Sequence, residues 1–295
     1  MGISIVIKGD IHKESATVQA SGFEEHVISD QNEKEALDMG DGSITYGVKQ
    51  YFGKEPNDVF LDSNACNKIL GYDLFSRFNW EQTKLILTPI KAEITGITSE
   101  PKMISQAFFE NKTDKTATYH ADMRQSVTES TSHTWSSTNT ISIGASINCS
   151  VELPGAKFGT DRTLSYSYAW GESKTASKAI EIGFESGVSV DLDPGETAIA
   201  KLSASQGKMT VRVTYKAYVD GRTAVNYNPV YQGPGFDKPH HFYALPTARV
   251  MDAKSLTPEW IFTEDIEIDF HEDAVITLEK GGQEKTIFMS HIASA

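Results

Sequence analysis

The feature that most constrains the fold of this 295-residue chain is the stretch ISIGASINCSVELPGAKFGTDRTLSYSYAW at 141–170. Apolar side chains occupy the odd positions up to Leu153 and, after a Pro-Gly pair, the even positions. Because successive side chains of a strand point to opposite faces, the pattern predicts two amphipathic strands joined by a turn. Pairing Leu153 with Phe158 across that turn places all the apolar side chains on one face.

The two faces of this predicted hairpin differ in chemistry. The apolar face contains Ile141, Ile143, Ala145, Ile147, Val151, Leu153, Phe158, Leu164, Tyr166, Tyr168 and Trp170. The polar face contains Ser142, Ser146, Asn148, Ser150, Glu152, Asp161, Thr163, Ser165 and Ser167. The turn is predicted at Pro154, Gly155 and Lys157.

The two predicted strands, which we call the arms of the hairpin, fit two architectures. Amphipathic strands form ordinary β-sandwiches with one face in the core. Each arm is also longer than the roughly 9–11 residues that a tilted membrane-spanning strand needs, and its polar face is small and nearly uncharged. A membrane admits no open sheet edge, so several chains would each contribute one hairpin to a closed barrel, with the apolar face toward lipid and the polar face toward the lumen. Arg162 is the exception on the apolar face, opposite Cys149 in this register, where an Arg at mid-bilayer costs about 2–4 kcal/mol.

Composition excludes some classes of partner. The net charge is -13, which argues against nucleic acid and against simple electrostatic adhesion to anionic lipid. Two cysteines are too few for a disulfide framework. We recognise no secretory signal at MGISIVIKGD and no apolar run long enough for a membrane-spanning helix. The chain also carries no G-x-S-x-G, H-E-x-x-H or phosphate-cradling glycine loop, so no enzyme activity and no cofactor are predicted.

The rest of the chain separates into a part with predicted helices and a part rich in predicted strands. A short helix is predicted over 30–42 and another at 63–80, capped by Ser63 or Asn64, with Ile69, Leu70, Leu74, Phe75 and Phe78 on one side. From about residue 83, short β-branched runs alternate with turn residues such as Pro-Gly and Asp-Gly. The fold class is therefore mainly β, with a long antiparallel body.

The order of several segments resembles the aerolysin-like β-pore-forming proteins, in the epsilon-toxin and mosquitocidal-toxin branch and its spherulin-like members. The segments that carry this resemblance cover about two thirds of the chain: FNWEQTKLILTPIKAEITGITSEP (78–101), SVTESTSHTWSSTNTISIG (126–144), LSYSYAWGESKTASKAIEIG (164–183), SGVSVDLDPGETAIAKLSASQGKMTVRVTYKAYVDG (186–221), AVNYNPVYQG (224–233) and EDIEIDF (264–270).

The resemblance implies an elongated β protein in three parts. A helix-containing, receptor-binding head corresponds to 1–90 and about 222–260. A β body with a terminal β-sandwich corresponds to 91–125, 179–221 and 261–295, and the insertion hairpin to 126–178, with its spanning part at 141–170. Such proteins are released in soluble form, bind a cell surface, oligomerise into a ring and insert the hairpins as a transmembrane barrel. An insect target fits the mosquitocidal branch, and Glu152 and Asp161 in the lumen predict mild cation selectivity.

Two aromatic clusters are candidate contacts for a protein or glycan receptor, although core packing explains such clusters as well. They are Tyr46, Tyr51, Phe52 and Tyr72 in the head, and Tyr227, Tyr231, His240, His241, Phe242 and Tyr243. Adjacent histidines without a third ligand do not predict a metal site. The alternative function is a non-lytic one on the same fold, either lectin-like binding or storage in a yolk or spore coat.

Overall fold

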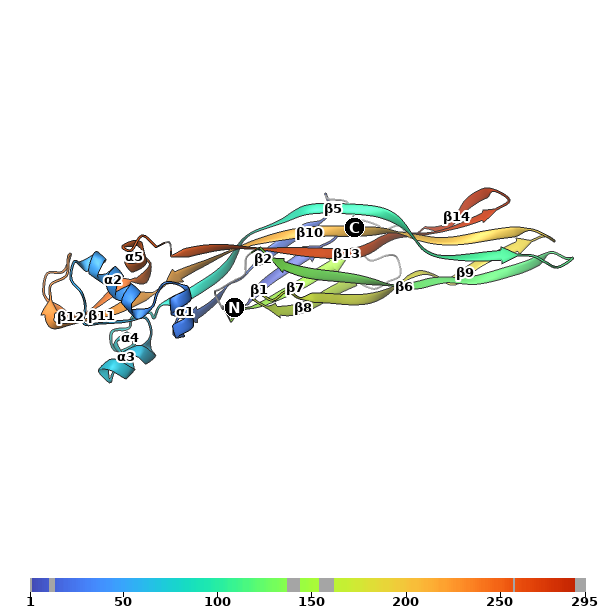
Figure 1. Ribbon diagram of the computed structural model, residues 1–295. Coiled ribbons are helices and arrows are strands. Elements are labelled where there is room, and N and C mark those ends of the chain that lie inside the picture. The colour runs from blue at the N-terminus through green and yellow to red at the C-terminus, as the bar shows by residue number, and fades with distance from the viewer. Residues whose placement is uncertain (1, 11–13, 137–143, 154–161, 257, 290–295) are drawn as a thin grey trace.

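The computed structural model describes residues 2–10, 14–136, 144–153, 162–256 and 258–289. The molecule is elongated, with the helices gathered at one end and long strands running toward the other (Figure 1). Three strands span most of its length: β5 (Lys84–Glu110), β10 (Thr197–Asp220) and β13 (Glu259–Lys280). The predicted mainly β, elongated architecture is confirmed.

The long strands belong to one mostly continuous antiparallel sheet. Its order is β3-β5-β10-β13-β6-β9, and β14 also pairs with β13. The remaining strands of this sheet are β3 (Glu24–Val27), β6 (Ala117–Trp135), β9 (Thr175–Leu192) and β14 (Gln283–Met289). The sequence explains β10 well: every second side chain from Met209 to Ala217 is buried, and those between them face outward.

A smaller sheet lies against the middle of the long one. Its order is β2-β1-β7-β8, formed by β1 (Ile3–Lys8), β2 (Thr17–Ser21), β7 (Ser146–Leu153) and β8 (Arg162–Ala169). β1 pairs with β7 in parallel, from Ile3 opposite Ile147 to Lys8 opposite Glu152. The first 21 residues were expected in the head, but β1 and β2 belong to the sheet of the hairpin.

Beyond this middle core the molecule continues as a sandwich. The ladder between β6 and β9 packs over the far ends of β5, β10 and β13 and forms a second core. Its buried side chains include Phe109, Met123, Leu192, Leu202 and Ile276. This is the terminal sandwich that the resemblance implied.

The head combines helices with a three-stranded sheet, in the order β12-β11-β4. Its elements are α1 (Gln31–Ala36), α2 (Asp41–Phe52), β4 (Asp58–Phe60), α3 (Ser63–Leu70), α4 (Leu74–Phe78), β11 (Arg222–Tyr231), β12 (His240–Pro246) and α5 (Thr247–Asp252).

The prediction of a helix over 63–80 differs from the structure in three respects. Gly71 adopts the left-handed conformation and ends α3, so that α4 begins separately after Asp73. The cap of α3 is Asp62, whose side chain accepts a hydrogen bond from the Ala65 amide at 2.9 Å. Ile69 and Phe78, predicted on one side with Leu74 and Phe75, are exposed, whereas Leu74 and Phe75 are buried.

Helix α2 was not predicted at all, although Ile44, Val48 and Phe52 are buried at helical spacing. Gly47 in its middle weakens the helical signal in the sequence. The structure gives a reason for this glycine: a Cβ there would lie 2.6 Å from the Val250 carbonyl oxygen of α5. The two helices therefore touch at this point through their backbones.

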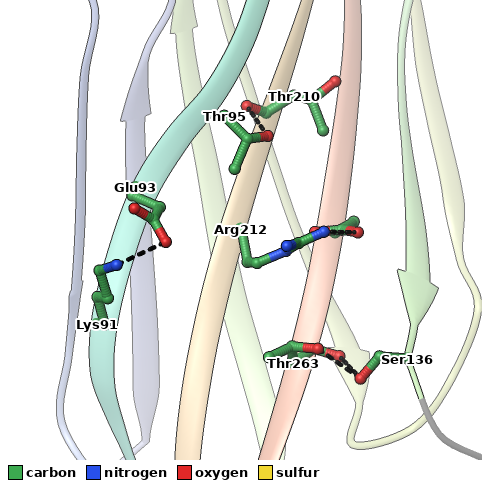
Figure 2. A network of polar contacts seen from close by, with 8 residues as sticks. Lys91, Glu93, Thr95, Ser136, Thr210, Arg212 and Thr263 are labelled. Carbon is green, nitrogen blue, oxygen red and sulfur yellow. Dashed lines mark hydrogen bonds and ion pairs between the residues drawn. The ribbon is translucent and has the colours of Figure 1, made fainter.

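The outward face of the long sheet is highly charged. Arg212 on β10 makes a two-bond ion pair with Asp265 on β13, at 2.7 and 2.9 Å. Figure 2 shows this region, with Lys91–Glu93 on β5 and the contact between Ser136 and Thr263 nearby. Further pairs across β10 and β13 are Lys201–Glu279, Lys208–Glu267 and Lys216–Glu259. Such a surface is typical of a permanently solvated strand face.

Among the described residues, no helix has both the length and the apolar character required to cross a membrane.

Candidate membrane-insertion hairpin

Strands β7 and β8 form the predicted hairpin with a different register. Leu153 pairs with Arg162 and Cys149 with Tyr166, where the predicted turn placed Phe158 and Arg162. The two registers differ by four residues, an even number, so every side chain keeps its predicted face. The turn residues Pro154, Gly155 and Lys157 lie outside the described residues, as do Ile141, Ser142, Ile143, Phe158 and Asp161.

The apolar face of the hairpin is buried. Ala145, Ile147, Val151, Leu153, Tyr168 and Trp170 are at most 8% exposed, and Leu164 and Tyr166 are partly buried. These side chains pack against β10 and β13 of the long sheet and against Ile3, Ile5 and Ile7 of β1. Each large apolar side chain that is fully buried contributes roughly 1.5–3 kcal/mol, so this face requires either the body or another apolar medium.

The polar face points outward and is built from small residues. Ser150 and Ser165 share a hydrogen bond of 3.1 Å across the strands, and the Ser167 hydroxyl donates to Asn148 at 2.6 Å. Ser146 and Thr163 are exposed, and Glu152 lies 3.5 Å from Lys8. This face contrasts with the Lys-Glu ladder on the long sheet, because only Glu152 among these residues carries a charge.

Arg162 is buried against two strands of the body. Its guanidinium donates to the Glu129 carboxylate on β6 at 2.5 Å and to the His271 carbonyl on β13 at 2.9 Å. Burial raises the pKa of Glu129, and the positive charge of Arg162 opposes part of that rise. Arg162 therefore ties the end of the hairpin to the body.

A second polar contact lies deeper beneath the hairpin. The His133 ring on β6 is hydrogen-bonded to the Tyr166 hydroxyl at 2.6 Å and to the Glu264 carboxylate at 2.7 Å. The Tyr215 hydroxyl donates to the other oxygen of Glu264 at 2.6 Å. The side chains of His133 and Glu264 are fully buried, and burial raises the pKa of the Tyr166 phenol. This network connects β8 to β6, β10 and β13.

The thiol of Cys149 shares the apolar face and is 2% exposed. Burial raises the pKa of this thiol to about 11. Cys149 is thus a neutral side chain at physiological pH. It lies opposite Ile5 of β1, which makes it a useful position for a cross-link.

The predicted receptor residues separate into a buried group and an exposed group. Phe52, Tyr227 and Tyr243 are buried at the centre of the head, with Tyr231 and Phe236 around them. Tyr227 and Tyr231 donate to the backbone carbonyls of Lys54 and Phe52. For these residues core packing is what the structure shows. Tyr46, Tyr51, Tyr72, His240 and His241 are exposed, and Phe242 is half-buried.

One partly exposed aromatic surface, with Trp80 and Phe242 half-buried, was only partly predicted. Phe78 stacks on Trp80 with ring centroids 4.8 Å apart, and the Phe242 ring lies 6.3 Å from the rings of both Tyr72 and Phe78. The Arg77 guanidinium lies over Tyr72 and Phe78. We call Tyr72, Arg77, Phe78, Trp80 and Phe242 the aromatic surface. The helical spacing grouped Phe78 on one side with Leu74 and Phe75, which are buried, and gave no sign of its exposure.

No group of three or more His, Cys, Asp or Glu side chains in the described part of the chain is arranged to hold a metal ion.

Comparison with known proteins gives the chain a family. The family model of Clostridium epsilon toxin ETX/Bacillus mosquitocidal toxin MTX2 matches residues 72–248, more than half of the chain. The chain belongs to the ETX/MTX2 family. The matched segment includes the whole hairpin with β6 and β9 on either side of it, so the family resemblance covers the element described above.

Relatives of this ETX/MTX2 protein occur among the U-megalopygitoxins of Megalopyge. U-megalopygitoxin(8)-Mc8 of Megalopyge crispata is 32% identical over 267 residues, covering 90% of this chain and 88% of the relative. U-megalopygitoxin(8)-Mo12 of Megalopyge opercularis is 31% identical over 277 residues, covering 94% and 91%. These matches extend beyond the family segment.

The fold of this ETX/MTX2 protein is also that of a solved toxin. The crystal structure of parasporin-2, a Bacillus thuringiensis toxin that recognizes cancer cells, superposes with a TM-score of 0.65 at 16% identity, covering 90% of this chain and 100% of that one. Family and fold together place the chain among the pore-forming toxins.

Proposed function

We propose that the soluble chain binds a receptor on a target cell, oligomerises into a ring, and inserts one hairpin per chain to form a transmembrane β-barrel. The observation that carries this proposal is the chemistry of the hairpin's two faces. One face is apolar and covered by the body, and the other is small, hydroxyl-rich and nearly uncharged. Lipid can replace the body against the first face, and water can fill a lumen against the second.

Insertion requires specific contacts to be broken. β7 must leave β1, Arg162 must leave Glu129, and Tyr166 must leave His133. β7 and β8 are each eight residues long, slightly less than a spanning strand needs. Residues on both sides of them, within 141–170, therefore have to join the barrel.

Leakage and assembly test this function together. Liposomes or cells loaded with dye are mixed with the protein, and dye release is followed beside gel analysis of oligomers that resist sodium dodecyl sulfate. The proposal expects release together with such oligomers. A stable monomer with no release on any cell or liposome would contradict it and would favour the non-lytic alternative of binding or storage. Cells of insects are the first targets to test, because of the family.

The aromatic surface is our candidate for receptor contact. Phe78 is exposed, Trp80 is half-buried beside it, and Arg77 lies over the Phe78 ring. Aromatic rings with an adjacent Arg are typical of recognition surfaces. We expect Phe78→Ala with Trp80→Ala to abolish cell binding while dye release from receptor-free liposomes at high protein concentration stays unchanged. Tyr46→Ala, far from this cluster in sequence, serves as an exposed aromatic control. Unchanged cell binding in the double variant would remove this assignment.

A further inference from the structure

The apolar face of β8 has a polar-tipped side chain at each end. Arg162 is the first residue of the strand and Trp170 follows its last, and both side chains lie on the face that packs against the body. Between them the same face presents Leu164, Tyr166 and Tyr168. A long side chain with an apolar stem and a polar tip is suited to the boundary between an apolar medium and water.

The indole N–H of Trp170 is an unsatisfied donor in the folded chain. The ring is 8% exposed and packs against Trp135, Tyr215 and Phe262, with ring centroids 4.5, 5.1 and 5.3 Å away. Its Nε1 atom is buried and donates to no acceptor in the described part of the chain. The neighbouring Trp135, by contrast, donates its indole N–H to the Glu172 carbonyl at 3.1 Å. Because a buried donor without an acceptor is costly, Trp170 gains a hydrogen bond when it reaches a polar boundary.

Arg162, at the other end of the face, is held by groups of the body. Its guanidinium donates to the Glu129 carboxylate on β6 and to the His271 carbonyl on β13. Insertion of the hairpin removes these contacts. A guanidinium on the lipid face is costly at mid-bilayer but costs little near an interface. The inserted strand is therefore most stable when Arg162 reaches a headgroup layer, where phosphate oxygens accept its N–H groups.

The spacing of the two ends fits the thickness of a bilayer. The eight residues of β8 together with Trp170 reach the lower end of the roughly 9–11 that a spanning strand needs. Trp170 also belongs to the ladder, because its amide donates to the Ala145 carbonyl at 2.9 Å. At about 3.3 Å per residue and a tilt of about 40°, Arg162 and Trp170 lie about 20 Å apart along the membrane normal. Their long side chains extend this span toward the edges of an apolar band about 25 Å tall.

We propose that Trp170 and Arg162 set the position of the inserted hairpin in the bilayer, with Trp170 in the headgroup layer of one interface and Arg162 in that of the other. This inference rests on the proposed function, since it requires the hairpin to enter a membrane. The partner is the phospholipid headgroup region, whose phosphate and ester oxygens accept hydrogen bonds from the indole and the guanidinium. Arg162 thus has a place in both states, beside Glu129 in the soluble chain and at an interface in the barrel.

Fluorescence quenching by brominated lipids measures the depth of Trp170. Phosphatidylcholine liposomes carry bromine either near the glycerol end or near the methyl end of the acyl chains, and the protein is added at high concentration. The signal of Trp170 is the difference between the wild type and Trp170→Phe. Trp260→Phe is the matched control, because Trp260 lies on β13 of the body. A chain with Trp80→Phe, Trp135→Phe and Trp260→Phe keeps Trp170 as the single one of four tryptophans and reads its depth directly.

The position of the strongest quenching decides the place of Trp170. We expect bromine near the glycerol end to quench Trp170 about twofold more than bromine near the methyl end, and Trp260 to be quenched by neither. Equal or stronger quenching of Trp170 from the methyl end, or no more quenching than Trp260 shows, overturns its place at the interface.

Bilayer thickness tests the place of Arg162. A span from Arg162 to Trp170 is short, so dye release should be about threefold faster from liposomes with short acyl chains than from liposomes with long ones, because a thick bilayer must thin around the barrel. Glu129→Leu/Arg162→Met removes the side chain that needs the second interface and should lose most of this preference. Equal or faster release by the wild type from the thick bilayers overturns the place of Arg162.

Dye release in the brominated liposomes separates this inference from the function itself. Release by the wild type with quenching of Trp170 from the glycerol end supports both. Release with quenching from the methyl end, or with none, overturns the inference and leaves the proposed pore standing. No release, with Trp170 quenched by neither lipid, overturns the proposed function and this inference with it.

Discussion

At the scale of single residues, Arg162 is the side chain whose role changed most. On the sequence it interrupts the apolar face of a hairpin, and in the structure it is the contact that fastens that face to the body. No pattern in the sequence reveals Glu129 and the His271 carbonyl as its partners, because they lie 33 and 109 residues away. Sequence periodicity assigns a face to a side chain but not a partner on another element.

Removing one partner of the buried Arg162–Glu129 pair should lower the free energy of unfolding more than replacing both partners does. We predict that Arg162→Met lowers the free energy of unfolding by about 3–5 kcal/mol, because the Glu129 carboxylate stays buried without its cation. Glu129→Leu/Arg162→Met should recover most of that loss, since two apolar side chains can pack together. Urea unfolding of both variants measures this, and a double variant as unstable as the single one would show that the pair is not the source.

His271 gives the hairpin's anchor a pH dependence. Burial lowers the pKa of His271, and the charges of Lys102 and Arg162 lower it further. A lowered folded-state pKa means that the neutral ring stabilises the fold above pH ~6.5, and that this stability is lost as the pH falls through the lower, folded-state value. Glu129 has a raised pKa, so its contribution has the opposite sign and grows on acidification.

Comparison of the wild type with His271→Gln isolates the histidine. We predict that the wild type loses stability between pH 6.5 and the lower folded pKa, and that the variant lacks this part of the loss. The midpoint of urea unfolding at a series of pH values measures it. Parallel curves for the two proteins would mean that His271 does not titrate in this window.

At the scale of elements, the sequence predicted which side chains of the hairpin share a face, but it did not predict which residues of the two strands pair. The alternation of small and apolar residues is a local property, so it survives any even shift of pairing. The pairing of Leu153 with Arg162 leaves eight residues between the paired ends, where the predicted pairing of Leu153 with Phe158 leaves four. The parallel pairing of β1 with β7 joins segments about 140 residues apart, which local periodicity cannot reveal.

The polar face of the hairpin makes a prediction about conduction. Glu152 is the charged residue among the described side chains of this face, and a lumen lined by it favours cations. We expect Glu152→Gln to reduce the cation preference of channels in planar bilayers. Reversal potentials under a salt gradient measure this, with Glu172→Gln, outside the spanning part, as the control. An unchanged preference in Glu152→Gln would place that side chain outside the lumen.

At the scale of the whole molecule, the sequence predicted the elongated β body, the helical head and the terminal sandwich. Turn residues and strand alternation along most of the chain predicted the antiparallel body, whereas the elongated shape, the head and the sandwich were implied by the family resemblance. The sequence misassigned β1 and β2 to the head and missed α2, because both depend on contacts between distant segments, such as that of Gly47 with Val250. From this arrangement follows our proposal that the head binds the receptor, the hairpin inserts into the membrane, and the body covers the apolar face of the hairpin before insertion.

The most direct test of that proposal is to cross-link the hairpin to the neighbouring strand β1 in the position that it has in this structure. Ile5→Cys places a thiol opposite Cys149 on the neighbouring strand, and a disulfide formed during oxidative folding would link β7 to β1. The same Ile5→Cys change with Cys149→Ala cannot form this link and is the control. We predict that the cross-linked protein releases no dye from target cells, that reduction restores release, and that the control releases dye with or without reductant. Dye release by the fully cross-linked protein at the control's rate would contradict the account, because β7 could then not be a strand that leaves β1 to enter the membrane.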